Sequence, residues 1–150
     1  MGGSVNNMFL GSYDYSIDDK GRLVIPSKFR NEIGDKLYLM KGYDGCISIY
    51  KESDFNNALN KLQTLQFEKE KARLHLRVLL ETVVELTIDK SGRIQLPIKT
   101  LQKYCIGKAV KIIGLLDHFE VWDSESWDKY RDEHEKDFEK DAEDLLKDEK

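Results

Sequence analysis

The chain has 150 residues, of which 40% are hydrophobic and 35% are charged, with a formal net charge of −4. This length suits about one ordinary domain, and the composition is typical of a globular protein with a hydrated surface. No apolar run approaches the roughly 18 residues of a membrane span, and no basic-then-apolar leader is present, so we expect a cytoplasmic protein without a membrane partner. Residues 1–7 are small and polar, and we take them as a vector-derived remnant.

The net charge is unevenly distributed along the chain. Residues 123–150 contain 6 Lys/Arg against 13 Asp/Glu, a net of −7, whereas residues 1–122 contain 18 against 15, a net of +3. The body is therefore mildly basic and the tail acidic. If the body binds nucleic acid, the tail will repel phosphate, so we expect the tail to point away from it.

The cysteine and histidine residues form no pattern typical of a metal or redox centre. The two cysteines stand far apart without a C-x-x-C motif, and the three histidines have no cysteine nearby at ligand spacing. We therefore expect no disulfide framework, no metal site and no cofactor.

An internal repeat organises the chain. The segment DDKGRLVIPSK at residues 18–28 recurs as DKSGRIQLPIK at residues 89–99, with Asp, Gly, Arg, Pro and Lys displaced by one fixed offset of 71 residues. Both prolines of the chain occupy the same position in the two copies. The sequence therefore predicts two copies of one structural unit.

Each copy begins with an alternation of polar and apolar residues that predicts a half-buried strand, at residues 12–17 and 84–88. The alternation resumes after a short turn, at residues 23–25 and 94–96, which predicts a hairpin in each copy. Gly21 and Gly92 are available for the positive φ that such a tight turn requires.

The rest of each copy reads as a short helix and two further strands. Pro26 and Pro97 suit the first turn of a helix, where a missing N–H costs little. Apolar strands follow at residues 37–40 and 109–113. Turns then lead into strands at residues 47–50 and 119–122.

Amphipathic helices are predicted after each copy. We divide the chain into repeat 1 (8–52), connecting helices (53–82), repeat 2 (83–125) and an acidic helical tail (126–150). One copy of about 45 residues is too small for a stable core without disulfides or metal, so the two copies should share one core. We predict a β-rich α+β fold, a pseudo-two-fold β-barrel in which hairpins of the two halves interleave.

A family resemblance follows from these residues. Met8-Phe9-Leu10-Gly11 precedes the first strand, and a D-x-x-x-R motif followed by an apolar-Pro step occurs twice, from Asp18 to Arg22 and from Asp89 to Arg93. Over about residues 8–130 the chain resembles the MraZ family of bacterial transcriptional regulators. That resemblance implies a fold similar to the swapped-hairpin barrels of AbrB and the MazE antitoxins. It also implies ring-like homo-oligomers at the nucleoid that bind direct repeats in double-stranded DNA upstream of the division and cell-wall gene cluster.

The repeated aspartates and glycines are predicted to be structural. The short carboxylates of Asp18 and Asp89 can accept backbone N–H bonds that fix the turns at Gly21 and Gly92, or pair with their arginines. A catalytic acid/base pair is the alternative, but no Ser, Cys or His recurs beside either carboxylate as nucleophilic chemistry would require.

The repeated arginines are the main candidates for a binding role. Arg22 and Arg93 stand just past the turn tips, and a guanidinium matches guanine O6/N7 or phosphate oxygens. On the residues alone, a solvated arginine bonded to its own aspartate is an equal alternative; the family resemblance favours DNA. Lys20 and Arg30 are added as candidate phosphate contacts.

Three classes of function compete. A DNA-binding regulator comes first, a structural or partner-binding oligomer of antitoxin-like fold second, and an enzyme last. The sequence contains no phosphate-cradling loop, no dinucleotide fingerprint and no nucleophile elbow, so we expect no catalysis and no small-molecule substrate. For the basic row Lys69, Arg73 and Arg77, a solvated helix face is favoured over an interface or a DNA contact.

Overall fold

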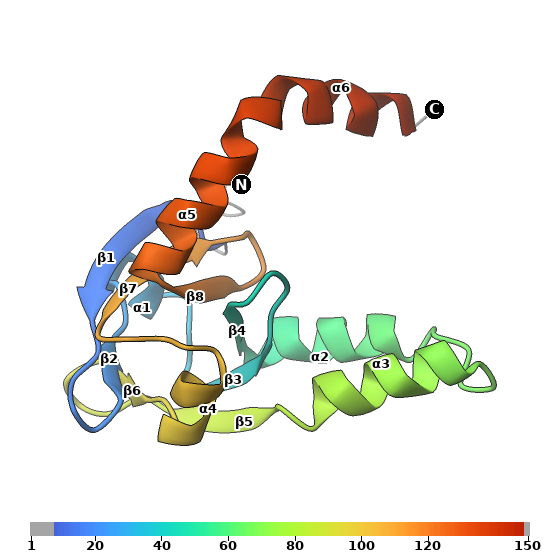
Figure 1. Ribbon diagram of the computed structural model, residues 1–150. Coiled ribbons are helices and arrows are strands. Elements are labelled where there is room, and N and C mark those ends of the chain that lie inside the picture. Colours follow the sequence, from blue (N-terminus) through green and yellow to red (C-terminus); the bar gives the residue numbers. More distant parts are fainter. Residues whose placement is uncertain (1–7, 149–150) are drawn as a thin grey trace, which may run out of the picture.

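A computed structural model describes residues 8–148 of the chain (Figure 1). The assignment of residues 1–7 as a remnant lies outside the described residues. The elements in chain order are β1 (Ser12–Ser16), β2 (Arg22–Val24), α1 (Ser27–Arg30), β3 (Lys36–Lys41), β4 (Ile47–Lys51), α2 (Glu52–Leu62), α3 (Glu70–Leu80), β5 (Val84–Thr87), β6 (Arg93–Gln95), α4 (Ile98–Lys103), β7 (Ala109–Gly114), β8 (Phe119–Asp123), α5 (Ser124–His134), the 3₁₀ turn η2 (Glu135–Asp137) and α6 (Phe138–Asp148). Within residues 8–148, no helix is both long and apolar enough to cross a bilayer.

The strands form two antiparallel sheets. Six of them lie in the order β1-β7-β8-β4-β3-β5, and β2 and β6 form a separate two-stranded ribbon. When β1–β4 of the first repeat are exchanged with β5–β8 of the second, the six-strand order is the same read from the other edge, and the ribbon again pairs β2 with β6. A pseudo-two-fold axis therefore passes between β4 and β8 and between β2 and β6. The mixed α+β, sheet-rich class is confirmed. The pairing within residues 8–148 does not close into a barrel, and the swapped-hairpin barrel is not confirmed.

The predicted hairpins are correct at the turns and wrong for the strands. The Asp18 N–H donates to the Arg22 carbonyl at 3.1 Å, and the same bond closes the second turn. Beyond these turns, β1 pairs with β7 and β2 pairs with β6. The two strands that flank the first turn therefore pair with strands of the other repeat and not with each other. The reason is burial: the central residues of the ribbon, Leu23 and Ile94, are 0% and 1% exposed. Pairing β2 with β6 puts both into one core that neither half could complete alone.

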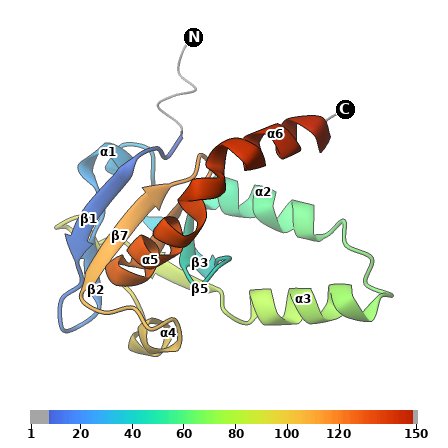
Figure 2. The same cartoon turned by 45° about the horizontal axis from the view of Figure 1, so that its top comes forward.

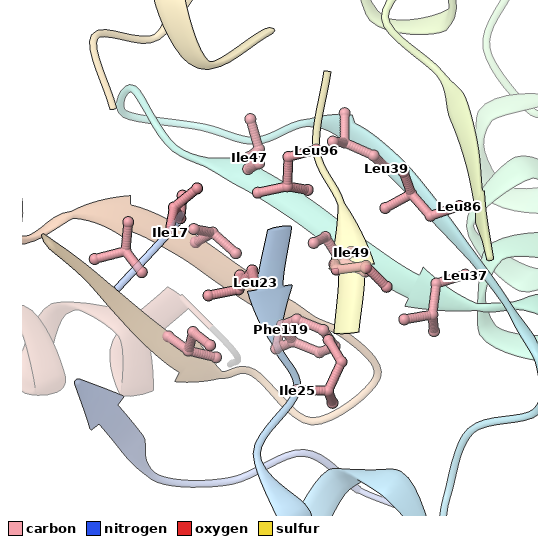
Figure 3. Close-up of a cluster of buried hydrophobic side chains, with 14 of the residues drawn as sticks. Ile17, Leu23, Ile25, Leu37, Leu39, Ile47, Ile49, Leu86, Leu96 and Phe119 are labelled. Atoms are coloured by element: carbon pink, nitrogen blue, oxygen red, sulfur yellow. The ribbon is translucent and has the colours of Figure 1, made fainter. Parts of the chain in front are cut away.

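The hydrophobic core lies between the ribbon and one face of the six-stranded sheet (Figure 3). Leu23 of β2 belongs to one buried cluster with residues that alternate along β3 and β4, such as Leu37 and Ile49. Phe9, which is fully buried, meets the ring of Phe119 edge-on at 5.5 Å between centroids. Both repeats therefore contribute residues to one hydrophobic cluster.

The opposite face of the sheet carries the helices. Tyr38 and Met40 of β3 point away from the core, and Tyr38 stacks on Phe55 of α2 with centroids 4.7 Å apart. Leu79 of α3 joins the same small cluster. The helices α2 and α3 therefore form an arm on the face away from the ribbon (Figures 1 and 2).

The helix α5 packs on the same outer face at the other half of the sheet. Trp122 of β8 meets Trp127 and Tyr130 of α5, with centroids 5.1 and 5.3 Å apart. Since α2 follows β4 and α5 follows β8 without a gap, the two helices are equivalent parts of the repeats. The acidic tail thus leaves from the face opposite to the ribbon.

Candidate nucleic-acid interface

The carboxylate of Asp18 organises the first turn. Its Oδ1 accepts hydrogen bonds from the N–H groups of Lys20 and Arg22 at 2.9 and 2.8 Å, and its Oδ2 accepts from Arg22 Nε at 2.6 Å. Gly21, with φ of 82°, supplies the left-handed conformation that the turn needs. The D-x-x-x-R spacing therefore places one carboxylate against both ends of a single tight turn.

The second turn repeats this arrangement bond for bond. Asp89 Oδ1 accepts from the N–H groups of Ser91 and Arg93 at 2.9 and 3.0 Å, and Oδ2 accepts from Arg93 Nε at 3.0 Å. Gly92 has φ of 75°. The structure thus brings each predicted turn residue together with its arginine.

These hydrogen bonds also set the charge of the two aspartates. The backbone N–H of Arg22 is the main cause that lowers the pKa of Asp18 below its ordinary 3.8, and Arg93 does the same for Asp89. Both carboxylates are therefore ionised at neutral pH and hold their arginines by charge-assisted bonds.

We expect the contribution of these carboxylates to stability to disappear in acid. Because their folded-state pKa values are lowered, the contribution is complete above the unfolded pKa near 3.8 and is lost as the pH falls through the folded values. The free energy of unfolding in urea, measured from pH 7 to pH 2, should fall more steeply below pH 4 for wild type than for Asp18→Asn/Asp89→Asn. Parallel curves for the two proteins would contradict this assignment.

Both arginines lie on the outward face of the ribbon. In its register, Arg22 stands opposite Gln95, and Arg93 stands opposite Val24. The central residue pair faces the core, so alternation along the strands directs these four positions outward. Diagonal neighbours across an antiparallel pair are about 7–8 Å apart, so the two guanidinium groups start from nearby points of one surface.

Each guanidinium is held at one end and open at the other. The side chains of Arg22 and Arg93 are 34% and 32% exposed. In the part of the chain that the structure describes, their side-chain hydrogen bonds run through Nε, which leaves both Nη groups for a ligand. Pairing with aspartate and binding to DNA are therefore compatible roles, because the carboxylate orients the group that would make the contact.

The other two candidate contacts lie at opposite ends of the ribbon. Lys20 is exposed at the tip of the first turn. Arg30 donates from Nε to the Ile25 carbonyl at 3.0 Å, and its guanidinium covers the second turn, where a Cβ added to Gly92 would meet Arg30 Cζ at 2.5 Å. Arg30 therefore supports a turn as well as adding positive charge, whereas Lys20 is free to reach a phosphate.

One residue of this surface was missed from the sequence. The Gln95 side chain donates to the Lys20 carbonyl at 2.9 Å and supports the first turn, as Arg30 supports the second. Its repeat counterpart is Val24, which has no amide. The sequence signal for Gln95 was this difference between the two copies at one equivalent position. The difference indicates that the two turns are supported by different side chains.

The model of one protein family matches the chain twice, at residues 8–78 and 79–149, with the description "MraZ protein, putative antitoxin-like". The chain belongs to the MraZ family. Each MraZ match contains one Asp–Arg turn and one strand of the ribbon, and MraZ is a regulator-type family with an antitoxin-like fold. The first MraZ match includes α2 and most of α3, and the second includes α5 and α6.

Proposed function

We propose that this protein is a sequence-specific transcriptional regulator that reads double-stranded DNA with the outward face of the β2–β6 ribbon. The observation that carries the proposal is the pair of aspartate-oriented arginines, one from each repeat, on that face. A two-stranded antiparallel ribbon fits the major groove, and the arginine fork matches guanine O6/N7.

The proposed roles follow the geometry. Arg22 and Arg93 contact bases or phosphates, and Lys20 adds a phosphate contact at one end of the ribbon. Arg30 holds the second turn and contributes charge at the other end. The acidic helices leave from the opposite face, where they do not oppose phosphate.

Assembly completes the proposed mechanism. A body with a net charge of only +3 makes few phosphate contacts, so one subunit binds weakly. A homo-oligomer on repeated operator sites converts such contacts into avidity, by factors of about 10² or more. Family membership supports a ring-like oligomer at the nucleoid. It also supports direct repeats upstream of the division and cell-wall gene cluster as the DNA target, and a fold related to the swapped-hairpin barrels of AbrB and MazE.

A partner-binding oligomer without a DNA preference is the second candidate. The exposed apolar side chains of α6 favour it, because they form a surface suited to a protein partner. Neither function uses a catalytic residue, a cofactor or a small-molecule substrate.

Selection from a randomised duplex pool, followed by titration of selected and scrambled duplexes at about 50 and 200 mM salt, separates the two candidates. The regulator should prefer the selected duplex by about 10³-fold or more, with affinity that falls steeply as salt rises. Equal affinity for both duplexes would remove the regulator and leave the partner-binding oligomer.

A further inference from the structure

The last helices of the two repeats are in different environments. In the first repeat, α3 packs against β3 and α2 through Leu79, which is only 8% exposed. Its counterpart α6 follows α5 across η2 and extends away from the body (Figure 2). Phe138, Leu145 and Leu146 of α6 are 72%, 66% and 64% exposed. The second repeat thus has an amphipathic helix whose apolar side is not covered.

The bend between α5 and α6 forms an apolar groove of about 360 Å³. We call it the tail groove; among its lining residues are Trp127, Tyr130, Phe138, Ala142 and Leu145. Phe138, Ala142 and Leu145 follow the spacing of one helix face. An exposed apolar surface rimmed by polar residues typically marks an interaction site.

The charge around the tail groove restricts what can bind there. Residues 124–148 contain 5 Lys/Arg and 11 Asp/Glu, a net of −6. A second tail would bring the same charge, and like charges brought together in an interface oppose association. Arg131 also lines the groove, but the two carboxylates of Glu135 and Asp141 outnumber it there. The groove therefore suits an apolar surface with basic surroundings.

The arm of the same chain carries such a surface. Phe67, Leu74 and Val78 are 62%, 60% and 38% exposed; Leu74 and Val78 lie one turn apart on the same side of α3, and Phe67 lies in the turn just before that helix. We call these three residues the arm stripe. Lys71 and Arg77 flank it, and residues 61–80 contain 5 Lys/Arg against 2 Asp/Glu, a net of +3. The arm stripe is thus apolar and basic where the tail groove is apolar and acidic.

We propose that the tail groove of one copy binds the arm stripe of a second copy. The arm (α2 and α3) and the tail helices (α5 and α6) of one chain project toward the same side of the body without meeting (Figures 1 and 2). Each copy then offers its tail groove to one neighbour and its arm stripe to another. Such a head-to-tail contact gives a ring if the rotation closes and an open chain if it does not. The interface specifies how the oligomer of the proposed function forms, and its formation does not depend on DNA.

The molar mass in solution, measured by sedimentation without DNA, tests this interface. Wild type should form assemblies of several copies. Phe138→Ser/Leu145→Ser and Lys71→Glu/Arg77→Glu should each reduce the mass to the 17.5 kDa of one chain. All four side chains are exposed, so the fold should survive. The matched control Lys28→Glu/Lys99→Glu makes the same charge change on exposed positions of α1 and α4 and should remain assembled.

A charge exchange makes the test specific. Glu135 and Asp141 line the tail groove, so Glu135→Lys/Asp141→Lys should not assemble alone. Mixed with Lys71→Glu/Arg77→Glu, it should co-assemble, because each interface in the mixture again joins opposite charges. A wild-type mass of one chain, assembly that survives both the apolar and the charge variants, or a mixture that stays monomeric would overturn the proposal. DNA preference is read separately on the monomeric variants, whose ribbon is unchanged.

Discussion

Arg22→Ala combined with Arg93→Ala should strongly reduce the preference for the selected duplex while the protein stays folded. Each bidentate arginine–guanine contact contributes about 1–3 kcal/mol of discrimination, so losing two reduces specificity by about 30-fold to 10⁴-fold. The fold should persist because both side chains lie on the outward face of the ribbon and about a third of each is exposed.

Titration of both duplexes at several salt concentrations measures this effect, and urea unfolding checks the fold. Lys36→Ala is a suitable control, because it removes an ion pair of 3.9 Å from the six-stranded sheet, away from the ribbon. Arg22→Lys/Arg93→Lys separates two kinds of contact: lysine keeps phosphate attraction but loses the bidentate fit, so specificity should fall more than affinity. If the double alanine variant kept full discrimination, the arginines would not be the reading residues.

Gly21→Ala should destabilise the protein more than Gly92→Ala, although the two glycines are repeat equivalents. Both have positive φ, 82° and 75°, which costs an L residue about 1–2 kcal/mol. A Cβ on Gly21 would lie 2.4 Å from the Leu96 carbonyl oxygen, which is backbone and cannot yield, and such a clash adds about 1–3 kcal/mol. A Cβ on Gly92 would meet the guanidinium of Arg30, which can move aside.

The free energy of unfolding in urea checks this difference. We expect a loss of about 2–5 kcal/mol for Gly21→Ala and about 1–2 kcal/mol for Gly92→Ala. Gly34→Ala is the control, since nothing lies within 4 Å of its Cβ position and its φ is not in the left-handed region; it should be nearly neutral. Equal losses at Gly21 and Gly92 would contradict the different support of the two turns.

The turns could be predicted from the sequence because their geometry is local. Asp18, Gly21 and Arg22 lie within five residues, and within residues 8–148 the carboxylate of Asp18 accepts hydrogen bonds from groups inside that span. The partners of the strands could not be predicted in the same way. Alternation along β1 and β2 specifies which side chains are buried, but it does not specify which strand lies alongside. Burial of Leu23 in a shared core decides that question.

The supporting residues and the helices show a second limit of the sequence. Gln95 and Arg30 act on turns distant in the sequence, and neither has an equivalent in the other repeat. Because residues 53–82 and 126–150 differ in charge, the sequence predicts a connecting segment and an acidic tail. In the structure, α2 and α5 occupy equivalent positions after β4 and β8. Amphipathic spacing in α6 predicts an apolar side, but not what covers it.

Photo-crosslinking to the selected duplex tests most directly whether the ribbon face meets DNA. In a Cys105→Ser background, which removes the exposed native thiol, Lys90→Cys places a crosslinker in the second turn, and Glu125→Cys places one on α5 at the opposite face. Crosslinks to DNA should form from position 90 and not from position 125. Crosslinking from position 125 alone would put DNA on the helical face and contradict a ribbon that reads DNA through Arg22 and Arg93.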